Sequence, residues 1–198
     1  MNFKSILVVA GEPHSIFLEI FFKSIKKNKF KKPIILIASK NLLIEQMKKL
    51  NFDLKFKIIK KEDIQGKELN NNYINLINVN YKFTHAFQKI SARSNQYISK
   101  CFEIALQLTS KNRDFSLING PINKKYFLNG SSLGITEYLE KKNKSKNEVA
   151  MLIFNKKLAV SPVTTHLALN DVAKNITKQK IFTQVNLIVD FYKKKFRK

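Results

Sequence analysis

Four short runs in the 198-residue sequence place glycine, proline or threonine beside side chains that could bind an anion or a metal ion. Lys124 could meet a phosphate or a carboxylate as a compact positive charge. His166, which directly follows two threonines, could bind a metal ion through one of its ring nitrogens. The four runs are GEPHS (11–15), NGPINK (119–124), GITEY (134–138) and VTTHL (163–167).

Each run also has an ordinary structural interpretation when it is taken alone. A turn with glycine and proline commonly joins a strand to a helix, and Lys124 is one lysine in a lysine-rich chain. A lone histidine is more often structural or solvated, and catalytic metal sites need further ligands. His14 and His85 lie far from His166 in the sequence, so the chain offers no obvious ligand set.

The segments between these runs alternate between strand-like and helix-like patterns. Short apolar runs predict buried strands, and apolar residues at helical spacing predict helices, the first of which Ser15 could cap. In open α/β sheets, ligands bind where the carboxyl ends of strands lead into helices, and the candidate runs lie at such junctions. The predicted strands cover residues 3–10, 33–39, 53–60, 74–79 and 115–118, and the predicted helices cover 16–27, 41–50, 86–110 and 123–128.

The last third of the sequence predicts smaller elements. A helix begins at Thr136, and two strands at 149–154 and 158–163 form a hairpin. A short helix at 171–176 and an amphipathic helix at 179–196 follow. This order of elements predicts the α/β class, as an α/β/α sandwich with a mostly parallel sheet. We expect an N-terminal α/β domain at 1–128 and the start of a second α/β domain, with the candidate metal-binding loop, at 129–198.

The composition is that of a globular protein, with 44% hydrophobic and 26% charged residues. No apolar run approaches the length of a membrane span, and the N-terminus does not resemble a signal peptide. We therefore expect a cytoplasmic protein without membrane partners. The single cysteine, Cys101, excludes an internal disulfide and a multi-cysteine metal site, and its apolar helical surroundings indicate a buried thiol.

A formal net charge of +23 raises the question of nucleic acid. Only three of the 37 basic residues are arginine (Arg93, Arg113 and Arg197), so lysine supplies the remaining 34. Nucleic-acid sites usually rely on arginine for bidentate contacts, and lysine here rises together with other residues that have AT-rich codons. We therefore interpret the charge as a solvated surface and do not expect nucleic acid as a partner. The positive field could still attract phosphate esters.

Taken together, the segments resemble one enzyme family. VVAGEP, NGPINK, GITEYL and AVSPVTTHLALNDV occur in the order of the GEPAGIGPE, TGPINK, GHTEYLA and VALVTTHxPLxDV patterns of the 4-hydroxythreonine-4-phosphate dehydrogenases. The resemblance covers essentially the whole chain. Its TTH segment and its GPINK and TEYL pair are fairly specific, whereas GEP alone is not.

The resemblance implies an isocitrate/isopropylmalate dehydrogenase-like fold, a homodimer, and an active site in a cleft between two α/β/α domains. It implies NAD or NADP as the cofactor, a divalent metal ion (Zn, Mg, Mn or Co), and a phosphorylated small molecule as the substrate. The reaction would be the oxidation and decarboxylation of 4-phosphooxy-threonine in vitamin B6 biosynthesis. By position, His166 matches a metal-binding histidine and Thr136 a substrate-binding threonine, and Lys124 is a further candidate for an anion contact.

The sequence also departs from the family pattern. Ile135 stands where the family has a substrate-binding histidine, and isoleucine cannot form that hydrogen bond. Bulkier residues at 14–17 replace Ala-Gly-Ile-Gly and should close space near a ligand, and Asn119 replaces a threonine. The family's other two metal-binding histidines would lie beyond Lys198. The sequence thus leaves three further hypotheses: a truncated enzyme, a relative acting on another phosphorylated hydroxy acid, or a non-catalytic remnant.

Overall fold

The computed structural model describes residues 5–65, 69–111, 115–143, 149–155 and 157–196. The chain divides into two compact units, Phe3–Asn129 and a second unit formed mainly by Gly130–Lys198. Each unit has its own secondary structure.

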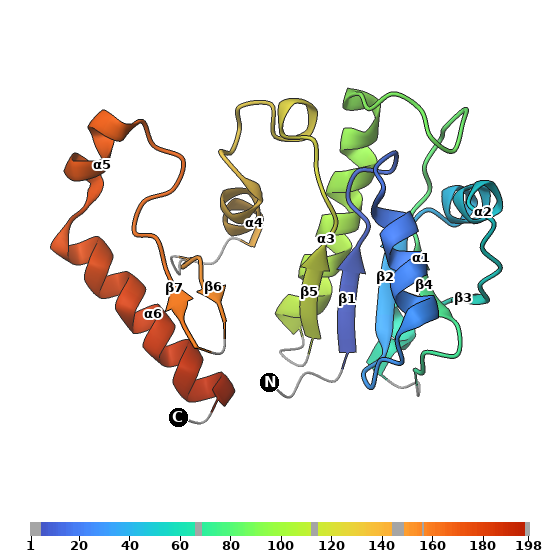
Figure 1. Ribbon diagram of the computed structural model, residues 1–198, viewed down its shortest axis with the longest axis horizontal. Coiled ribbons are helices and arrows are strands. Elements are labelled where there is room, and N and C mark those ends of the chain that lie inside the picture. Colours follow the sequence, from blue (N-terminus) through green and yellow to red (C-terminus); the bar gives the residue numbers. More distant parts are fainter. Residues whose placement is uncertain (1–4, 66–68, 112–114, 144–148, 156, 197–198) are drawn as a thin grey trace. The chain divides into compact units, whose positions relative to one another are not determined.

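A five-stranded parallel sheet forms the centre of the Phe3–Asn129 unit (Figure 1). Its strand order is β3-β4-β2-β1-β5, and all four neighbouring pairs are parallel. Parallel neighbours need crossover connections, which the helices between the strands supply. The strands are β1 (Ser5–Val9), β2 (Ile34–Ala38), β3 (Phe56–Ile58), β4 (Ile74–Asn78) and β5 (Phe115–Asn119).

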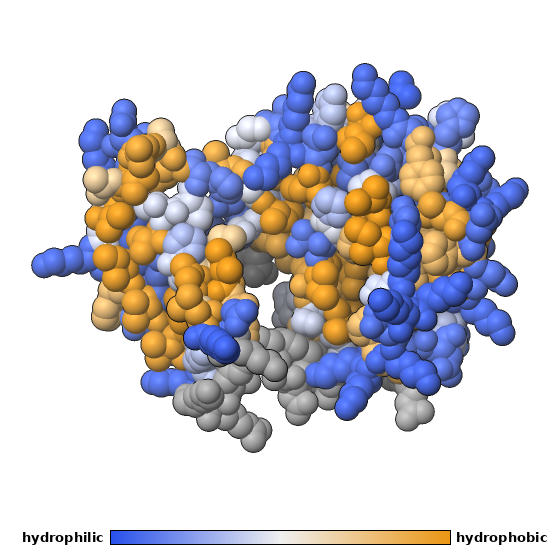
Figure 2. Space-filling model, in the orientation of Figure 1, coloured by the Kyte–Doolittle hydropathy of each residue, from blue (hydrophilic) through white to orange (hydrophobic). Residues whose placement is uncertain are grey.

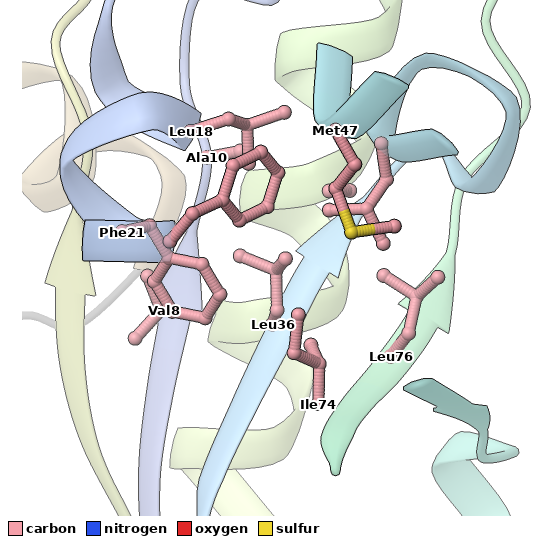
Figure 3. Close-up of a cluster of buried hydrophobic side chains, with 11 residues drawn as sticks. Val8, Ala10, Leu18, Phe21, Leu36, Met47, Ile74 and Leu76 are labelled. Carbon is pink, nitrogen blue, oxygen red and sulfur yellow. The ribbon is translucent and has the colours of Figure 1, made fainter. Parts of the chain in front are cut away.

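Both faces of the inner strands β1, β2 and β4 are largely buried. On one face, α1 (Phe17–Lys27) and α2 (Lys40–Lys49) pack on alternate strand residues, including Val8, Leu36 and Leu76 (Figure 3). The intervening strand residues Leu7, Val9, Ile35 and Ile37 are also buried, and α3 (Asn95–Lys111) contacts β1, β2 and β5. Burial on both faces explains why these strands read as nearly continuous apolar runs in the sequence. This confirms the prediction of an α/β fold with a mostly parallel sheet.

The predicted helix at 86–110 is too long at its beginning. A 3-10 turn (Ala92–Ser94) precedes α3, and residues 86–91 are not helical. The backbone carbonyl of Ala86 accepts a hydrogen bond from the Gln46 side chain at 2.9 Å, and the His14 ring lies 3.3 Å from the same oxygen. Long-range side-chain contacts thus hold this segment in a loop, which periodicity along the chain does not reveal.

The predicted cap of the first helix is also wrong. Helix α1 begins at Phe17 with Ile16 at the N-cap position and no side-chain cap. The Ser15 hydroxyl instead donates to the backbone carbonyl of Glu12 at 2.8 Å and accepts from the Phe17 amide at 3.3 Å. Ser15 therefore closes the turn after β1 and leaves the helix to start one residue later.

The described residues of the Gly130–Lys198 unit form three helices and one hairpin. They are α4 (Ile135–Asn143), the antiparallel pair β6 (Ile153–Phe154) and β7 (Ala159–Val160), α5 (Leu169–Asn175) and α6 (Lys178–Phe196). The hairpin confirms the predicted antiparallel pair, although its paired part is much shorter than expected. The Gln184 side chain on α6 donates to the backbone carbonyl of Pro162 at 2.7 Å and links the helix to the segment after β7.

Many large apolar side chains of this second unit are exposed to solvent (Figure 2). Among its described residues, Tyr138 is the one large apolar side chain that is buried. Helix α6 exposes four apolar residues of types that usually lie in a core. They are Ile181, Phe182, Val185 and Val189. None of the described helices in either unit combines the length and the apolar run that a bilayer crossing requires.

Candidate active site

The GEP turn after β1 and the NGPI turn after β5 meet backbone to backbone. The Gly120 amide donates to the Val9 carbonyl at 2.7 Å, and the Glu12 amide donates to the Pro121 carbonyl at 2.8 Å. A Cβ on Gly11 would lie 2.3 Å from the Pro121 oxygen, and Gly11 has φ +73°. Since β1 and β5 are parallel neighbours, both turns lie at the carboxyl edge of the sheet.

Glycine is needed on both sides of this contact. A Cβ on Gly120 would lie 2.2 Å from the Ala10 carbonyl oxygen, which is backbone and cannot rotate away. The Phe17 ring also lies over Gly120, 2.9 Å from the same Cβ position. Two of the candidate runs therefore form one structure, and the Phe17 ring packs over it.

Lys124 follows this contact at the start of a single helical turn, Lys124–Leu128. The Asn123 side chain accepts from the Tyr126 amide at 3.1 Å and fixes the beginning of the turn. The Lys124 side chain is exposed and forms no hydrogen bond or ion pair with any residue that the structure describes. Its ammonium group is therefore available to an anionic ligand.

Glu12 is a buried acid in the first turn, only 3% exposed. One carboxyl oxygen, Oε2, accepts a hydrogen bond from the Ser94 hydroxyl at 3.0 Å. The other, Oε1, is shielded from solvent and has no hydrogen-bond partner among the described residues. Burial raises the pKa of Glu12, and the hydrogen bonds from Ser94 and from the His14 backbone oppose that rise. Sequence reasoning missed this residue because Ser94 lies 82 positions away.

His14 joins the same turn to the segment after β4. Its Nδ1 lies 3.3 Å from the Ala86 carbonyl, which can only accept, so Nδ1 carries the proton. Its Nε2 lies 3.0 Å from the Tyr81 hydroxyl and accepts from it when the ring is neutral. Burial lowers the pKa of His14 and favours that neutral form. His14 therefore acts as a structural link between two loops.

A second polar group lies in the Gly130–Lys198 unit at the start of α4. The Thr165 hydroxyl donates to Glu137 Oε1 at 3.1 Å. Glu137 Oε2 and His166 Nε2 both lie close to Gly134, at 2.8 and 3.3 Å from the position of a Cβ there. The GITEY and VTTHL runs therefore come together, and a side chain larger than glycine at 134 would displace the acid or the imidazole.

His166 is exposed and has φ +55°, a left-handed conformation that is uncommon outside glycine. Glu137 Oε2 is buried without a hydrogen-bond partner among the described residues. A carboxylate oxygen without a partner, close to an imidazole, can orient that ring for metal binding. Glu137 was not assigned from the sequence, although it stands beside the predicted Thr136 in the same run.

The structure places Thr136, half-buried, in the first turn of α4 and His166 in the loop before α5, so both belong to the Gly130–Lys198 unit. Lys124 belongs to the Phe3–Asn129 unit. The residues that the structure describes include no cluster of three or more histidine, cysteine, aspartate or glutamate side chains that could hold a metal ion. His166 with Glu137 beside it fits one corner of such a site, and further ligands would have to come from elsewhere.

A parallel α/β sheet whose glycine-rich turns and polar side chains gather at the carboxyl ends of its strands defines a class of proteins that bind small molecules there. Residues 29–198 match the family described as "Pyridoxal phosphate biosynthetic protein PdxA". The chain belongs to this family.

Named relatives agree with this assignment. The chain is 32% identical over 193 residues to a 4-hydroxythreonine-4-phosphate dehydrogenase of Sulfurihydrogenibium sp. (strain YO3AOP1), covering 96% of the chain and 58% of the relative. The corresponding enzyme of Aquifex aeolicus is 26% identical over 196 residues, covering 98% of the chain and 59% of the relative. The chain thus spans somewhat less than three fifths of the length of these relatives.

Solved structures with the same fold carry the same enzyme name. A 4-hydroxythreonine-4-phosphate dehydrogenase from Klebsiella pneumoniae superposes with a TM-score of 0.80 at 21% identity, covering 96% of this chain and 59% of that one. One from Burkholderia phymatum gives a TM-score of 0.76 at 19% identity, covering 94% of this chain and 57% of that one. At these identities the likeness establishes the fold.

Proposed function

We propose that this chain contributes to the NAD(P)-dependent oxidation and decarboxylation of 4-phosphooxy-threonine, the 4-hydroxythreonine-4-phosphate dehydrogenase reaction of vitamin B6 biosynthesis. Its family and its named relatives support the reaction class and a phosphorylated small-molecule substrate. The same relationship supports an isocitrate/isopropylmalate dehydrogenase-like arrangement of two domains, divided near residues 128 and 129, and a homodimer.

The observation that carries this proposal is the meeting of Gly134, Glu137, Thr165 and His166. In the proposed site, His166 binds a divalent metal ion through one ring nitrogen, and Glu137 orients the ring. The hydrogen bond from Thr165 fixes one oxygen of Glu137, and the other oxygen and the imidazole both lie near Gly134. Thr136 would contact the substrate from the first turn of α4, and Lys124 would attract its phosphate or carboxylate group.

When bound, the metal ion would supply Lewis acidity for the oxidation, and NAD or NADP would accept the hydride. The residues of this chain would have simpler tasks. His166 and Glu137 would hold the cation, and the Thr136 hydroxyl would contact the substrate; Lys124, in the Phe3–Asn129 unit, is proposed separately as an anion contact. The positive charge of the whole chain would raise the local concentration of that substrate.

Metal content of the purified 198-residue chain tests the proposal directly. After incubation with Zn²⁺ or Mn²⁺ and removal of the excess, His166→Ala should hold clearly less metal than the unmodified chain. Glu137→Gln should weaken affinity about 10- to 100-fold, as loss of an orienting partner usually does. His85→Ala is the matched control, because His85 is an exposed histidine in the other unit. Equal metal content in the His166 and His85 variants would refute the assignment of His166.

One residue favours a second candidate function, action on another phosphorylated hydroxy acid. Ile135 is half-buried at the first position of α4, directly before Thr136, and has no polar atom to offer a substrate. If 4-phosphooxy-threonine is the substrate, Ile135→His should tighten its binding about tenfold in a calorimetric titration with metal present, since a charge-assisted hydrogen bond contributes that much. Unchanged or weaker binding would favour the second candidate.

A further inference from the structure

A cavity of about 650 Å³ lies in the Phe3–Asn129 unit, beyond the carboxyl end of β4. Its wall comes from the segment that follows β4 and from the beginning of α3. This volume is within the range of small-molecule sites in proteins. Neither Lys124 nor Glu12 lines it, although Tyr81 in its wall is hydrogen-bonded to His14 of the first turn. The residues that matter for its chemistry are Tyr81, Lys82, Phe83, Arg93 and Tyr97.

Arg93 is unusual in this protein. Of the 37 basic residues only three are arginine, and Arg93 is the one that falls within the described ranges 5–65, 69–111, 115–143, 149–155 and 157–196. Lysine offers a compact point charge, whereas the planar guanidinium of arginine offers a rigid fork of N–H donors that fits a phosphate or a carboxylate with two hydrogen bonds. The exposed Arg93 side chain forms no hydrogen bond or ion pair with any described residue. The fork is therefore open to a ligand, and Lys82 adds a second positive charge to the same cavity.

Aromatic rings form another part of the wall. Tyr81 and Phe83 lie nearly parallel, with ring centroids 6.2 Å apart and an interplanar angle of 18°. Tyr81 also packs on Tyr97, at 4.8 Å between centroids. Aromatic faces beside cationic groups suit a ligand that has both a planar ring and a negative charge.

Buried contacts hold this wall in place. Tyr81 is bound by the His14 ring at 3.0 Å, and Tyr97 accepts a hydrogen bond from the Ser39 amide at 3.1 Å. Gln46, which is fully buried, donates to the carbonyls of Ala86 and Pro13, each at 2.9 Å. A ligand would thus enter a cavity whose aromatic side is already ordered, which lowers the entropic cost of binding.

We propose that this cavity binds a ligand that joins a phosphate group to a planar ring, with Arg93 as the phosphate fork and Tyr81 and Phe83 as the ring contact. Two sources share this chemistry: a nucleoside monophosphate and a phosphorylated pyridine, the type of compound that the family description names. The choice of these two ligand classes rests on the proposed function, whereas the assignment of the cavity itself does not. The geometry of the cavity does not involve His166.

Calorimetric titration of the full 198-residue chain at low salt tests the proposal with three probes: AMP, pyridoxine 5′-phosphate and inorganic phosphate. At least one of the two ring phosphates should bind more tightly than inorganic phosphate, and the tighter of the two identifies the source. Arg93→Ala should weaken that binding about 10- to 100-fold, because it removes charge-assisted hydrogen bonds. Arg93→Lys should recover only part of the loss, since it keeps the charge without the fork.

Lys48→Ala is the matched control, because it removes one exposed positive charge from α2 at a distance in sequence from the cavity. It should change the affinity less than about twofold, as expected for a screened surface charge. Phe83→Ala should weaken the ring phosphates and leave inorganic phosphate unchanged. Equal affinity for all three probes, failure of both ring phosphates to bind at millimolar concentration, or equal losses in the Arg93→Ala and Lys48→Ala variants would overturn the proposal. Metal content of the His166→Ala variant is measured separately, so either proposal can fail alone.

Discussion

Replacing Gly11 by alanine tests the contact on which the first part of the candidate site depends. Gly11 has φ +73°, and a Cβ there would lie 2.3 Å from the backbone oxygen of Pro121. Gly130 offers a matched comparison, because it has the same φ of +73° but no atom within 4 Å of its Cβ position. Both alanine variants meet the same backbone strain, and only Gly11→Ala meets the clash.

The expected magnitudes follow from these two terms. A left-handed conformation costs a non-glycine residue about 1–2 kcal/mol. Overpacking against atoms that cannot rotate away adds about 1–3 kcal/mol. Gly130→Ala should therefore cost about 1–2 kcal/mol and Gly11→Ala about 2–5 kcal/mol, out of a total stability that is typically about 5–15 kcal/mol. Alanine restricts the unfolded chain equally at both sites, so that effect cancels in the comparison.

The two glycines belong to different units, so the assay must report on each unit separately. Hydrogen exchange measured by mass spectrometry does this, because peptides from β1 and β5 report on one unit and peptides from α4 on the other. Gly11→Ala should lower the opening free energy of the β1 and β5 peptides by more than Gly130→Ala lowers that of the α4 peptide. If the two losses are equal, the close approach of the GEP and NGPI turns is not real.

Two further predictions concern buried titratable groups in the Phe3–Asn129 unit. Because the pKa of Glu12 is raised above its ordinary 4.5, the folded state holds this proton more tightly than the unfolded chain, and stability falls as pH rises from about 4.5 through the folded pKa. Glu12→Gln, which can still accept from Ser94, should gain stability relative to the unmodified chain between pH 4.5 and 7.5 in urea unfolding; a constant difference would contradict the burial of an ionisable acid. Burial raises the pKa of Cys101 to about 12, so a thiol reagent should label it in the native protein only at the rate of local opening, and rapid labelling at pH 8 would show that the thiol is accessible.

The inner strands of the sheet, β1, β2 and β4, could be predicted from sequence because they are largely buried on both faces. Runs such as residues 34–38 contain no polar residue, so neither the strand nor its burial depends on knowing its neighbours. The strand at 53–60 was predicted too long, since only Phe56–Ile58 pairs with β4. It lies at the edge of the sheet, where one side of the strand has no partner to extend it.

One long-range hydrogen bond and one local hydrogen bond explain two of the errors. The segment at 86–91 has apolar residues that suit a helix, but Gln46 binds the Ala86 carbonyl from 40 positions away. Ser15 has the right type and place for a cap, but the Glu12 carbonyl lies closer to its hydroxyl than the amides of α1 do. Periodicity and capping preferences are general tendencies, and they fail where a particular hydrogen bond, near or distant in the sequence, has the lower free energy.

Some residues of the candidate site can be proposed from short sequence runs, and others can be recognised only from their contacts in the structure. Lys124, Thr136 and His166 were proposed from short runs and a family resemblance, and their roles stay predictions. Glu12 and Glu137 were not proposed, because an acid in a turn or in a helix is ordinary until its burial is known. Each acid has one carboxyl oxygen without a hydrogen-bond partner among the described residues. The other oxygen accepts from a hydroxyl, that of Ser94 at Glu12 and that of Thr165 at Glu137.

This shared arrangement suggests how the two groups differ. The histidine next to Glu12 in the first turn is His14, and its two ring nitrogens are already hydrogen-bonded to the Ala86 carbonyl and the Tyr81 hydroxyl. Around Glu137 the neighbour is His166, which is exposed and has no hydrogen bond to any described residue. An imidazole whose nitrogens are both occupied can only link loops, whereas a free one can still bind a metal ion. The same pair of residue types therefore supports a structural role at the first turn and a chemical role at α4, and the metal content of the His166→Ala variant tests that distinction.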